Sequence, residues 1–203
     1  VLVNKNKSLQ SVHYHDEDKD NFIRLSKVLR RNTVKNVLQH PTATINNSSF
    51  WGVDLGEKYW GDNFISVTSD TNVNYSVLDE KEICFNPSRA NVGSFGINMS
   101  GYKVSVSSAY PVYKVFNNDY LPEYIYLQLM HNPEVKEDII TRCFGTVRQS
   151  LGVDDFLKIQ VPVLNLTSQK EIVSQTVERI NLINESRADL ANHLEKTYGF
   201  IDE

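Results

Sequence analysis

The stretch Ile83-Cys-Phe-Asn-Pro-Ser-Arg-Ala-Asn-Val-Gly-Ser-Phe-Gly-Ile97 and the run that follows it, residues 104–115, decide the fold class. In the first stretch, three apolar residues are stopped by an Asn-Pro pair, and a loop with two glycines follows. In the second, Val104 and Val106 alternate with polar residues, which is the period of a strand with one buried face. Pro111 indicates the start or the edge of another strand. The pattern predicts three strands joined by a loop and a turn, over residues 83–85, 102–106 and 110–116.

After residue 120 the sequence changes from strand patterns to helix patterns. Pro122 and Pro133 each stand where a first helical turn would begin, and Asn132 is a suitable N-cap for a helix over residues 133–143. Residues 156–164 return to a strand-like apolar run that ends in a proline break. We therefore expect two short helices followed by a strand.

The sequence before residue 83 is less regular. Residues 1–20 end in a charged segment without periodicity, which we interpret as a linker or leader. Residues 21–37 carry apolar side chains three and four residues apart, which leaves open a short amphipathic helix or a strand followed by a turn. Residues 48–77 alternate β-branched and aromatic runs with Gly, Asn and Asp, which predicts irregular β structure with long loops.

The C-terminal segment predicts one long helix. Ser168 and Glu171 have the spacing of a capping box, and Gly199 would end the helix. About thirty residues at 1.5 Å each give a rod of roughly 45 Å. Its heptad seam is mostly apolar, so we expect an interface with a partner helix formed by Val173, Ile180, Ile183, Leu190 and Leu194. The alternative is a helix that folds back on the core of its own domain.

Composition describes a globular chain of 203 residues, with 40% hydrophobic residues, 23% charged residues and a net charge of −4. This balance excludes collagen-like, low-complexity and wholly disordered classes. The charge is uneven, because residues 21–120 carry ten Lys and Arg against eight acids, whereas residues 121–203 carry eight against thirteen. The densest basic run is Arg24, Lys27, Arg30, Arg31 and Lys35. It is either a solvated surface segment or part of a surface that binds nucleic acid.

The low cysteine content favours a reducing setting, so we expect the protein to lie in the cytoplasm. Cys84 and Cys143 are too few for a disulfide scaffold or a four-ligand zinc site, and both have apolar neighbours typical of a core. No apolar run approaches the roughly 18 residues that would span a bilayer. The chain lacks an initiator methionine and a signal-peptide core, which indicates a fragment or a processed piece.

Catalytic motifs are weak throughout. Asn86-Pro87-Ser88-Arg89 lacks the second proline and the aromatic residue that hold a target amine in amino-methyltransferases. Asp119, Glu134 and Lys136 formally match the Asp…Glu-x-Lys pattern of metal-dependent nucleases. A nuclease that uses these residues is the alternative function. His13 and His15 lie in the polar leader without a second cluster to complete a metal shell. We predict no active site, no metal site and no cofactor.

Several ordered blocks together are more specific than any single motif. They are residues 83–97, 104–115, 121–126, 145–151, 156–164 and 169–173. This series resembles the target recognition domain of type I restriction-modification specificity subunits and the entry to that family's spacer helix, over residues 21–198. The departures are a missing second proline in the 156–164 block and the absence of the usual Trp-containing opening, which leave the start of the domain open.

The resemblance implies an α+β fold: an irregular, β-rich DNA target recognition domain with short helices over residues 21–165, then a long coiled-coil-type spacer or dimerisation helix over residues 166–203. Full subunits of this family carry two such units, so the chain holds half of that content. The implied function is non-catalytic recognition of double-stranded DNA, which positions a partner or fused adenine methyltransferase. A restriction subunit and a homodimer through the C-terminal helix are further expected partners, and a membrane is not.

The candidate DNA-binding residues include a turn in which Arg89, Asn91 and Ser94 accompany the amides of Gly93 and Gly96, expected to be exposed. Such a turn suits the binding of phosphates. The alternative is an ordinary turn in which Arg89 pairs with a nearby acid. The other candidates are basic side chains elsewhere in the chain: Arg30, Arg31, Lys58, Lys103 and Arg148.

Overall fold

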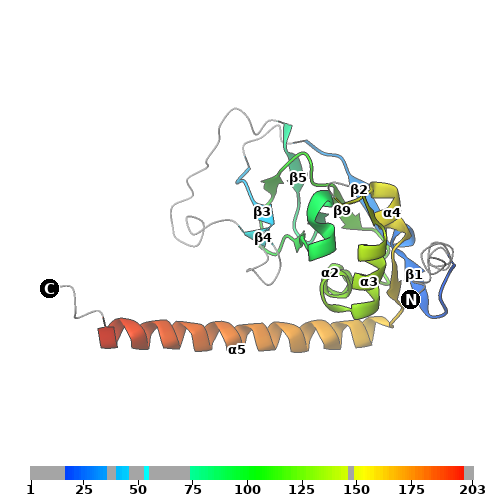
Figure 1. Cartoon of the computed structure of the whole chain (residues 1–203). Coiled ribbons are helices and arrows are strands. Elements are labelled where there is room, and N and C mark those ends of the chain that lie inside the picture. Colours follow the sequence, from blue (N-terminus) through cyan, green and yellow to red (C-terminus); the bar gives the residue numbers. More distant parts are fainter. Residues whose placement is uncertain (1–16, 36–39, 46–52, 55–73, 146–148, 199–203) are drawn as a thin grey trace, which may run out of the picture.

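The computed structural model describes residues 17–35, 40–45, 53–54, 74–145 and 149–198. Short antiparallel strands, 3₁₀ helices and α-helices form the body of the molecule, and one long helix follows (Figure 1). The elements are β1 (Phe22–Arg24), the 3₁₀ helix η1 (Leu25–Lys27), β2 (Leu29–Asn32), β3 (Thr44–Ile45), β4 (Val53–Asp54), β5 (Ser76–Leu78), β6 (Ile83–Phe85), the 3₁₀ helix η4 (Pro87–Val92), β7 (Phe95–Ile97), β8 (Val104–Val106), β9 (Val112–Val115), α2 (Pro122–His131), α3 (Pro133–Thr141), β10 (Cys143–Phe144), β11 (Ser150–Leu151), α4 (Val153–Lys158), β12 (Gln160–Pro162) and α5 (Leu166–Tyr198).

The central sheet is antiparallel, with the strand order β2, β9, β6, β7. Three strands predicted from the sequence are confirmed as β6, β8 and β9. The predicted loop after Arg89 is only partly a loop, because η4 ends in a left-handed Gly93 and the chain then returns as β7. In β7, Gly96 pairs with Cys84 of β6. The position of β2 at the sheet edge leaves one side of this strand without a neighbour in the sheet.

Both faces of the sheet are covered by buried side chains. On one face an aromatic cluster forms, in which the ring centroid of Phe156 lies 4.5 Å from that of Phe85 and 4.8 Å from that of Tyr113. On the other face Cys84 and Val112 pack against side chains of the β5–β8 pair. The alternation of these two sets along each strand follows from the two-residue period of the β conformation.

The two ends of the body meet, because β1 pairs with β12. Residues 22–32 form a strand, a 3₁₀ turn and a second strand, so the second interpretation of that region is confirmed. The strand predicted over residues 156–164 is wrong in its first half, where Phe156 to Lys158 end α4. Asp154 and Asp155 in the first turn favour this helix through its dipole, and the helix turns Phe156 into the core.

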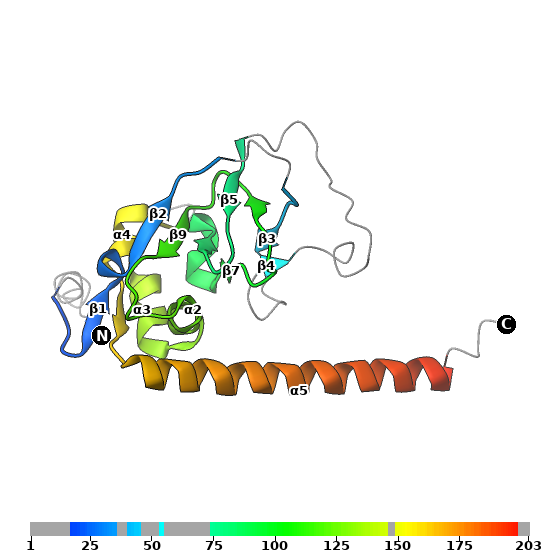
Figure 2. The ribbon, with the colours of Figure 1, turned by 180° about the vertical axis from the view of Figure 1, so that it is seen from behind.

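Both predicted short helices are confirmed. Proline occupies the first turn of α2 and of α3, and the Asn132 side chain accepts hydrogen bonds from the amides of Glu134 and Val135, 3.0 and 3.4 Å away. The two helices lie between the central sheet and α5 (Figures 1 and 2). The sheet and the long helix therefore occupy opposite sides of the α2–α3 layer.

The long helix is confirmed, although its start differs from the prediction. It begins at Leu166, and the Asn165 side chain accepts the amide hydrogen bond of Ser168 at 2.9 Å, so Asn165 and not Ser168 is the cap. The helix runs along the body and then projects beyond it as a straight rod (Figures 1 and 2). The α+β fold class with a long C-terminal helix is thus confirmed.

Candidate nucleic-acid interface

The edge strand β2 and its neighbour β9 place basic side chains on the molecular surface. Arg30 stands directly opposite Lys114 in the antiparallel register, and Arg31 stands opposite Tyr113. Both arginines and Lys114 are exposed. They line a hollow of about 530 Å³, called here the β2–β9 hollow, whose lining is Arg30, Arg31, Asn32, Glu82, Lys114, Val115, Phe116 and Asn118. Two of the sequence-predicted residues, Arg30 and Arg31, are therefore brought together here, whereas Lys114 was missed.

The side chains of Arg30 and Lys114 have no protein acceptor within the part of the chain that the structure describes. The guanidinium of Arg30 instead lies over the ring of Phe116, with its Cζ atom 4.9 Å from the ring centroid. Arg30, Lys114 and Phe116 share one face of the strand pair, because Phe116 is two residues beyond Lys114. Lys114 is the one charged residue of β9, which could have indicated it, but only the pairing with β2 brings it to Arg30.

The acidic groups near the β2–β9 hollow are engaged by other partners. Glu82 is 5% exposed, and its Oε2 accepts hydrogen bonds from Asn32 Nδ2 at 2.7 Å and from the Asp79 amide at 2.9 Å. Asp79 in turn pairs with Lys103, with 3.0 Å between Oδ2 and Nζ. Burial pushes the pKa of Asp79 upward, but the hydrogen bonds from Lys103 and the Glu80 amide, together with the charges of Lys103 and Lys114, hold that pKa below its ordinary value. Lys103 is therefore an exposed cation with an acidic partner.

The buried side of the same strands contains one unusual group. Tyr113 is fully buried, and among the described residues its hydroxyl has no hydrogen-bond partner. Burial raises the pKa of Tyr113 to about 12, although the nearby charge of Arg31 acts in the opposite direction. The phenol is therefore neutral at physiological pH.

The turn around η4 differs in part from its prediction. Arg89 is exposed, as expected of a phosphate contact, and Asn91 donates a hydrogen bond to the Gln149 side chain at 3.2 Å. Ser94 is only 6% exposed, and its backbone amide donates to the Arg89 carbonyl. The amide of Gly93 donates to the Ala90 carbonyl, and Gly96 is buried in a strand, so the expectation of exposed glycine amides is wrong. The chain closes this turn on itself, which leaves Arg89 as its main outward cation.

Lys58 and Arg148 lie outside the described residues, as does most of the irregular β region expected over residues 48–77.

The expected partner interface on α5 divides into two parts. Val173 packs against the main core, and Ile180 is half-buried. Beyond them Ile183, Leu190 and Leu194 are 52%, 57% and 45% exposed. Leu182, which the heptad assignment missed, joins Ile183 and Leu190 in lining a shallow groove on the helix.

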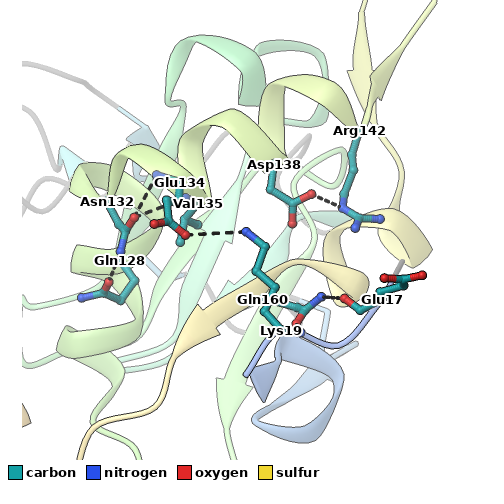
Figure 3. A network of polar contacts seen from close by, with 9 residues as sticks. All are labelled: Glu17, Lys19, Gln128, Asn132, Glu134, Val135, Asp138, Arg142 and Gln160. Atoms are coloured by element: carbon teal, nitrogen blue, oxygen red, sulfur yellow. Dashed lines mark hydrogen bonds and ion pairs between the residues drawn. The ribbon is translucent and has the colours of Figure 1, made fainter. Parts of the chain in front are cut away.

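The residues of the alternative nuclease site do not form a metal cluster. Glu134 pairs with Lys19 at 3.6 Å, and its backbone amide is held by Asn132 (Figure 3). Asp119 is exposed, and its carbonyl oxygen accepts a hydrogen bond from Gln169. Within the described ranges no group of three His, Cys, Asp or Glu residues could hold a metal ion. Both cysteines are buried, and burial raises the pKa of each thiol.

The described helices include none that is long and apolar enough to cross a membrane.

Three solved structures are similar to the chain at low sequence identity. The S subunit of a type I restriction-modification system from M. genitalium matches with a TM-score of 0.53 and 13% identity, over 90% of this chain and 46% of that chain. The HsdS subunit from Thermoanaerobacter tengcongensis matches with a TM-score of 0.48 and 13% identity, over 89% and 44%. A structure concerned with complex assembly and conformational transition of the type I R-M system matches with a TM-score of 0.48 and 14% identity, over 94% and 47%.

The chain thus spans less than half the length of each of these structures, and the first of them shows the same fold. No curated protein matches the sequence. The family comparison is the decisive one, since the Type I restriction modification DNA specificity domain matches residues 18–195, which include the central sheet, the β2–β9 hollow and nearly all of α5. This chain belongs to the type I restriction modification DNA specificity domain family.

Proposed function

We propose that this chain recognises a specific sequence in double-stranded DNA and positions a partner or fused adenine methyltransferase, together with a restriction subunit, on that site. The observation that carries the proposal is the β2–β9 hollow, where Arg30 and Lys114 are exposed without a protein acceptor in the described part of this DNA specificity domain. Exposed Arg and Lys side chains of this kind bind the phosphates and the base edges of a duplex.

The body and α5 have separate tasks in this proposal. The recognition domain spans residues 21–165, and Arg89 adds a phosphate contact outside the β2–β9 hollow. Residues 17–19 contact this domain through Gln160, which accepts from the Lys19 amide and donates to the Glu17 carbonyl (Figure 3). The boundary of the leader at residue 20 stays a prediction.

The helix over residues 166–203 pairs with a second helix in this proposal. Its outer half exposes Leu182, Ile183, Leu190 and Leu194, which a second apolar helix would cover. The partner is α5 of a second copy or the corresponding helix of a second recognition unit. Either pairing sets two DNA-binding surfaces at a fixed separation. The proposed setting is the cytoplasm.

A binding panel tests the proposed function. The full chain is incubated with a randomised duplex library, alone and with its modification subunit, at two stated salt concentrations, and the bound duplexes are sequenced. We expect enrichment of one defined sequence, bound at least about 10³-fold more tightly than unrelated duplexes. Binding without any sequence preference, both with and without the modification subunit, would contradict the proposal.

A further inference from the structure

The β2–β9 hollow holds two like charges in a position that costs stability. Arg30 and Lys114 are directly opposed across an antiparallel strand pair, where like charges repel each other. Glu82 lies in the same hollow, but it is buried and already accepts from Asn32 and from the Asp79 amide. Asp79 is bound to Lys103. The charge of Asp79 also acts on Lys114, but no direct ion pair within the described residues joins Arg30 or Lys114 to an acid. A ligand with negative charge or acceptor atoms would therefore stabilise this pair of cations.

Phe116 fixes the orientation in which Arg30 can meet such a ligand. The guanidinium Cζ lies over the Phe116 ring, 4.9 Å from the ring centroid, so the ring restricts the positions that the guanidinium can take. The N–H donors at the edge of the guanidinium remain without a protein acceptor in the described part of the chain. A planar fork held in this way is suited to a rigid acceptor that presents two oxygen or nitrogen atoms side by side.

The position of the hollow favours a base edge as the partner of this fork. β2 is the edge strand of the four-stranded sheet, and sheet strands are among the elements that place side chains in a groove of DNA. In the major groove the O6 and N7 atoms of guanine form the pair of acceptors that arginine binds most often. The compact ammonium of Lys114 instead suits a phosphate, since it offers one point charge and no fixed fork.

A second polar group of the hollow is excluded from base reading by its own hydrogen bonds. Asn32 donates through Nδ2 to Glu82 at 2.7 Å and to the Val77 carbonyl at 3.5 Å, and its Oδ1 accepts from the Val34 amide at 2.9 Å. The amide therefore has no free donor and acceptor pair of the kind that reads adenine. Of the two arginines that line the hollow, Arg31 stands opposite Tyr113 on the other face of the strand pair, so Arg30 is the one that shares a face with Lys114.

We infer that Arg30, oriented by Phe116, is a specificity-determining residue that binds the O6 and N7 atoms of one guanine, while Lys114 binds a nearby phosphate. This inference rests on the proposed function, since it assigns the reading of one base pair to a named side chain. Phe116 acts as a positioning residue, because it contacts the guanidinium and not the base.

The test compares the sequences that variants of the full chain select from the randomised duplex library. Arg30→Ala and Arg30→Lys are expected to lose the preference for guanine at a single position and to keep the preference elsewhere. For the wild-type chain, 7-deazaguanine at that position removes the N7 acceptor and lowers affinity roughly 5- to 150-fold. The same replacement has no further effect on Arg30→Ala, because the group that would sense it is absent.

Two further variants separate the roles in the hollow. Lys114→Gln is expected to weaken binding to all duplexes alike and to reduce the slope of log K against log salt by about one unit. Phe116→Leu keeps an apolar side chain but removes the ring, so the guanine preference should weaken at the same single position as in Arg30→Ala. Thermal melting of each variant checks that the body remains folded, and Arg30→Lys retains the charge if Arg30→Ala is unstable.

The outcomes separate this inference from the proposed function. A wild-type chain that selects no sequence contradicts the proposed function, and the inference fails with it. If the wild-type chain selects a sequence but the Arg30 variants retain every preference and bind more weakly to all duplexes, Arg30 is a phosphate contact and only the inference is overturned. Unchanged binding and unchanged selection in folded Arg30 variants would also overturn it, by placing the hollow away from the DNA.

Discussion

The two halves of α5 have the same secondary structure and different surroundings. In the first half, Gln169 is fully buried, and Ile172 and Val173 pack against the main core. In the second half, every residue from 181 to 198 is exposed, including large apolar side chains such as Leu182 and Leu190. In proteins most of the stability of a helix comes from packing of its apolar face. The docked half is therefore stabilised by its own domain, whereas the outer half has an apolar stripe that only another helix would cover.

Gln169 connects the docked half of α5 to the body of the molecule. Its Oε1 accepts from the Leu121 amide at 2.9 Å, and its Nε2 donates to the carbonyls of Asp119 and Leu164 at 2.8 Å each. All three partners are backbone groups at the start of α2 and before α5. One buried side chain of α5 thus satisfies three backbone groups of the body, alongside the apolar contacts of Ile172 and Val173.

The largest expected effect follows from removing this connection. Gln169→Leu should lower the free energy of unfolding by about 3–5 kcal/mol, because it leaves three backbone groups without their partner. Urea denaturation measures the change, and Gln169→Glu should lose at least as much, because its buried carboxylate keeps the acceptor for Leu121 but faces the carbonyls of Asp119 and Leu164 without a donor. A loss below about 1 kcal/mol in the Leu variant would show that the docked half is held by apolar contacts alone.

A charge in the outer half should have the second largest effect, and only on association. Ile183→Asp is expected to leave the unfolding of the monomer unchanged within about 0.5 kcal/mol, because the side chain is 52% exposed. It should weaken dimerisation or docking of the modification subunit by about 3 kcal/mol, since an unpaired carboxylate would be buried in an apolar seam.

Light scattering with and without the modification subunit measures the association of the Ile183 variant. Asn181→Asp is the control, because two residues along a helix turn the side chain by about 200°, to the opposite face. An unchanged mass for Ile183→Asp under both conditions would contradict the assignment of this face to a partner helix.

The body and the outer half should also respond differently to loss of a surface cation. Arg89→Ala is expected to weaken binding to cognate and unrelated duplexes equally and to reduce the slope of log K against log salt by about one unit. Association through α5 should not change. Fluorescence anisotropy at several salt concentrations measures the slope, and a destabilised variant with the wild-type slope would instead assign Arg89 to the structure of the turn.

The smallest expected effect concerns a hydroxyl inside the body. Tyr113→Phe should leave the free energy of unfolding unchanged or raise it by up to about 1 kcal/mol, since the hydroxyl is buried without a partner in the described structure. Tyr124→Phe is the matched comparison, because the Tyr124 hydroxyl donates to the Pro162 carbonyl at 2.9 Å. We expect that variant to lose about 1 kcal/mol in urea denaturation. A clear loss in Tyr113→Phe would indicate that this hydroxyl has a partner after all.

Local sequence signals determined where several helices and strands of this protein lie along the chain. The prolines at 122 and 133 and the cap at Asn132 placed two helices, the alternation around Val104 placed a strand, and the heptad spacing placed the rod. Each of these signals acts between residues a few positions apart, where backbone conformation and side-chain spacing are coupled directly. The ordered blocks also placed the chain in its family, which the family comparison confirms.

Tertiary structure alone decided how these elements meet. The pairing of β2 with β9 joins Arg30 to Lys114, and the burial of Gln169 joins α5 to the start of α2. Phe156 lies in helix α4 and not in the expected strand, and there its ring packs against that of Phe85 in the core. Spacing along the chain cannot specify the partner or the register of a strand some eighty residues away. Both are set by which apolar faces are buried together, and a shift of one residue would turn Arg30 to the other face of the sheet.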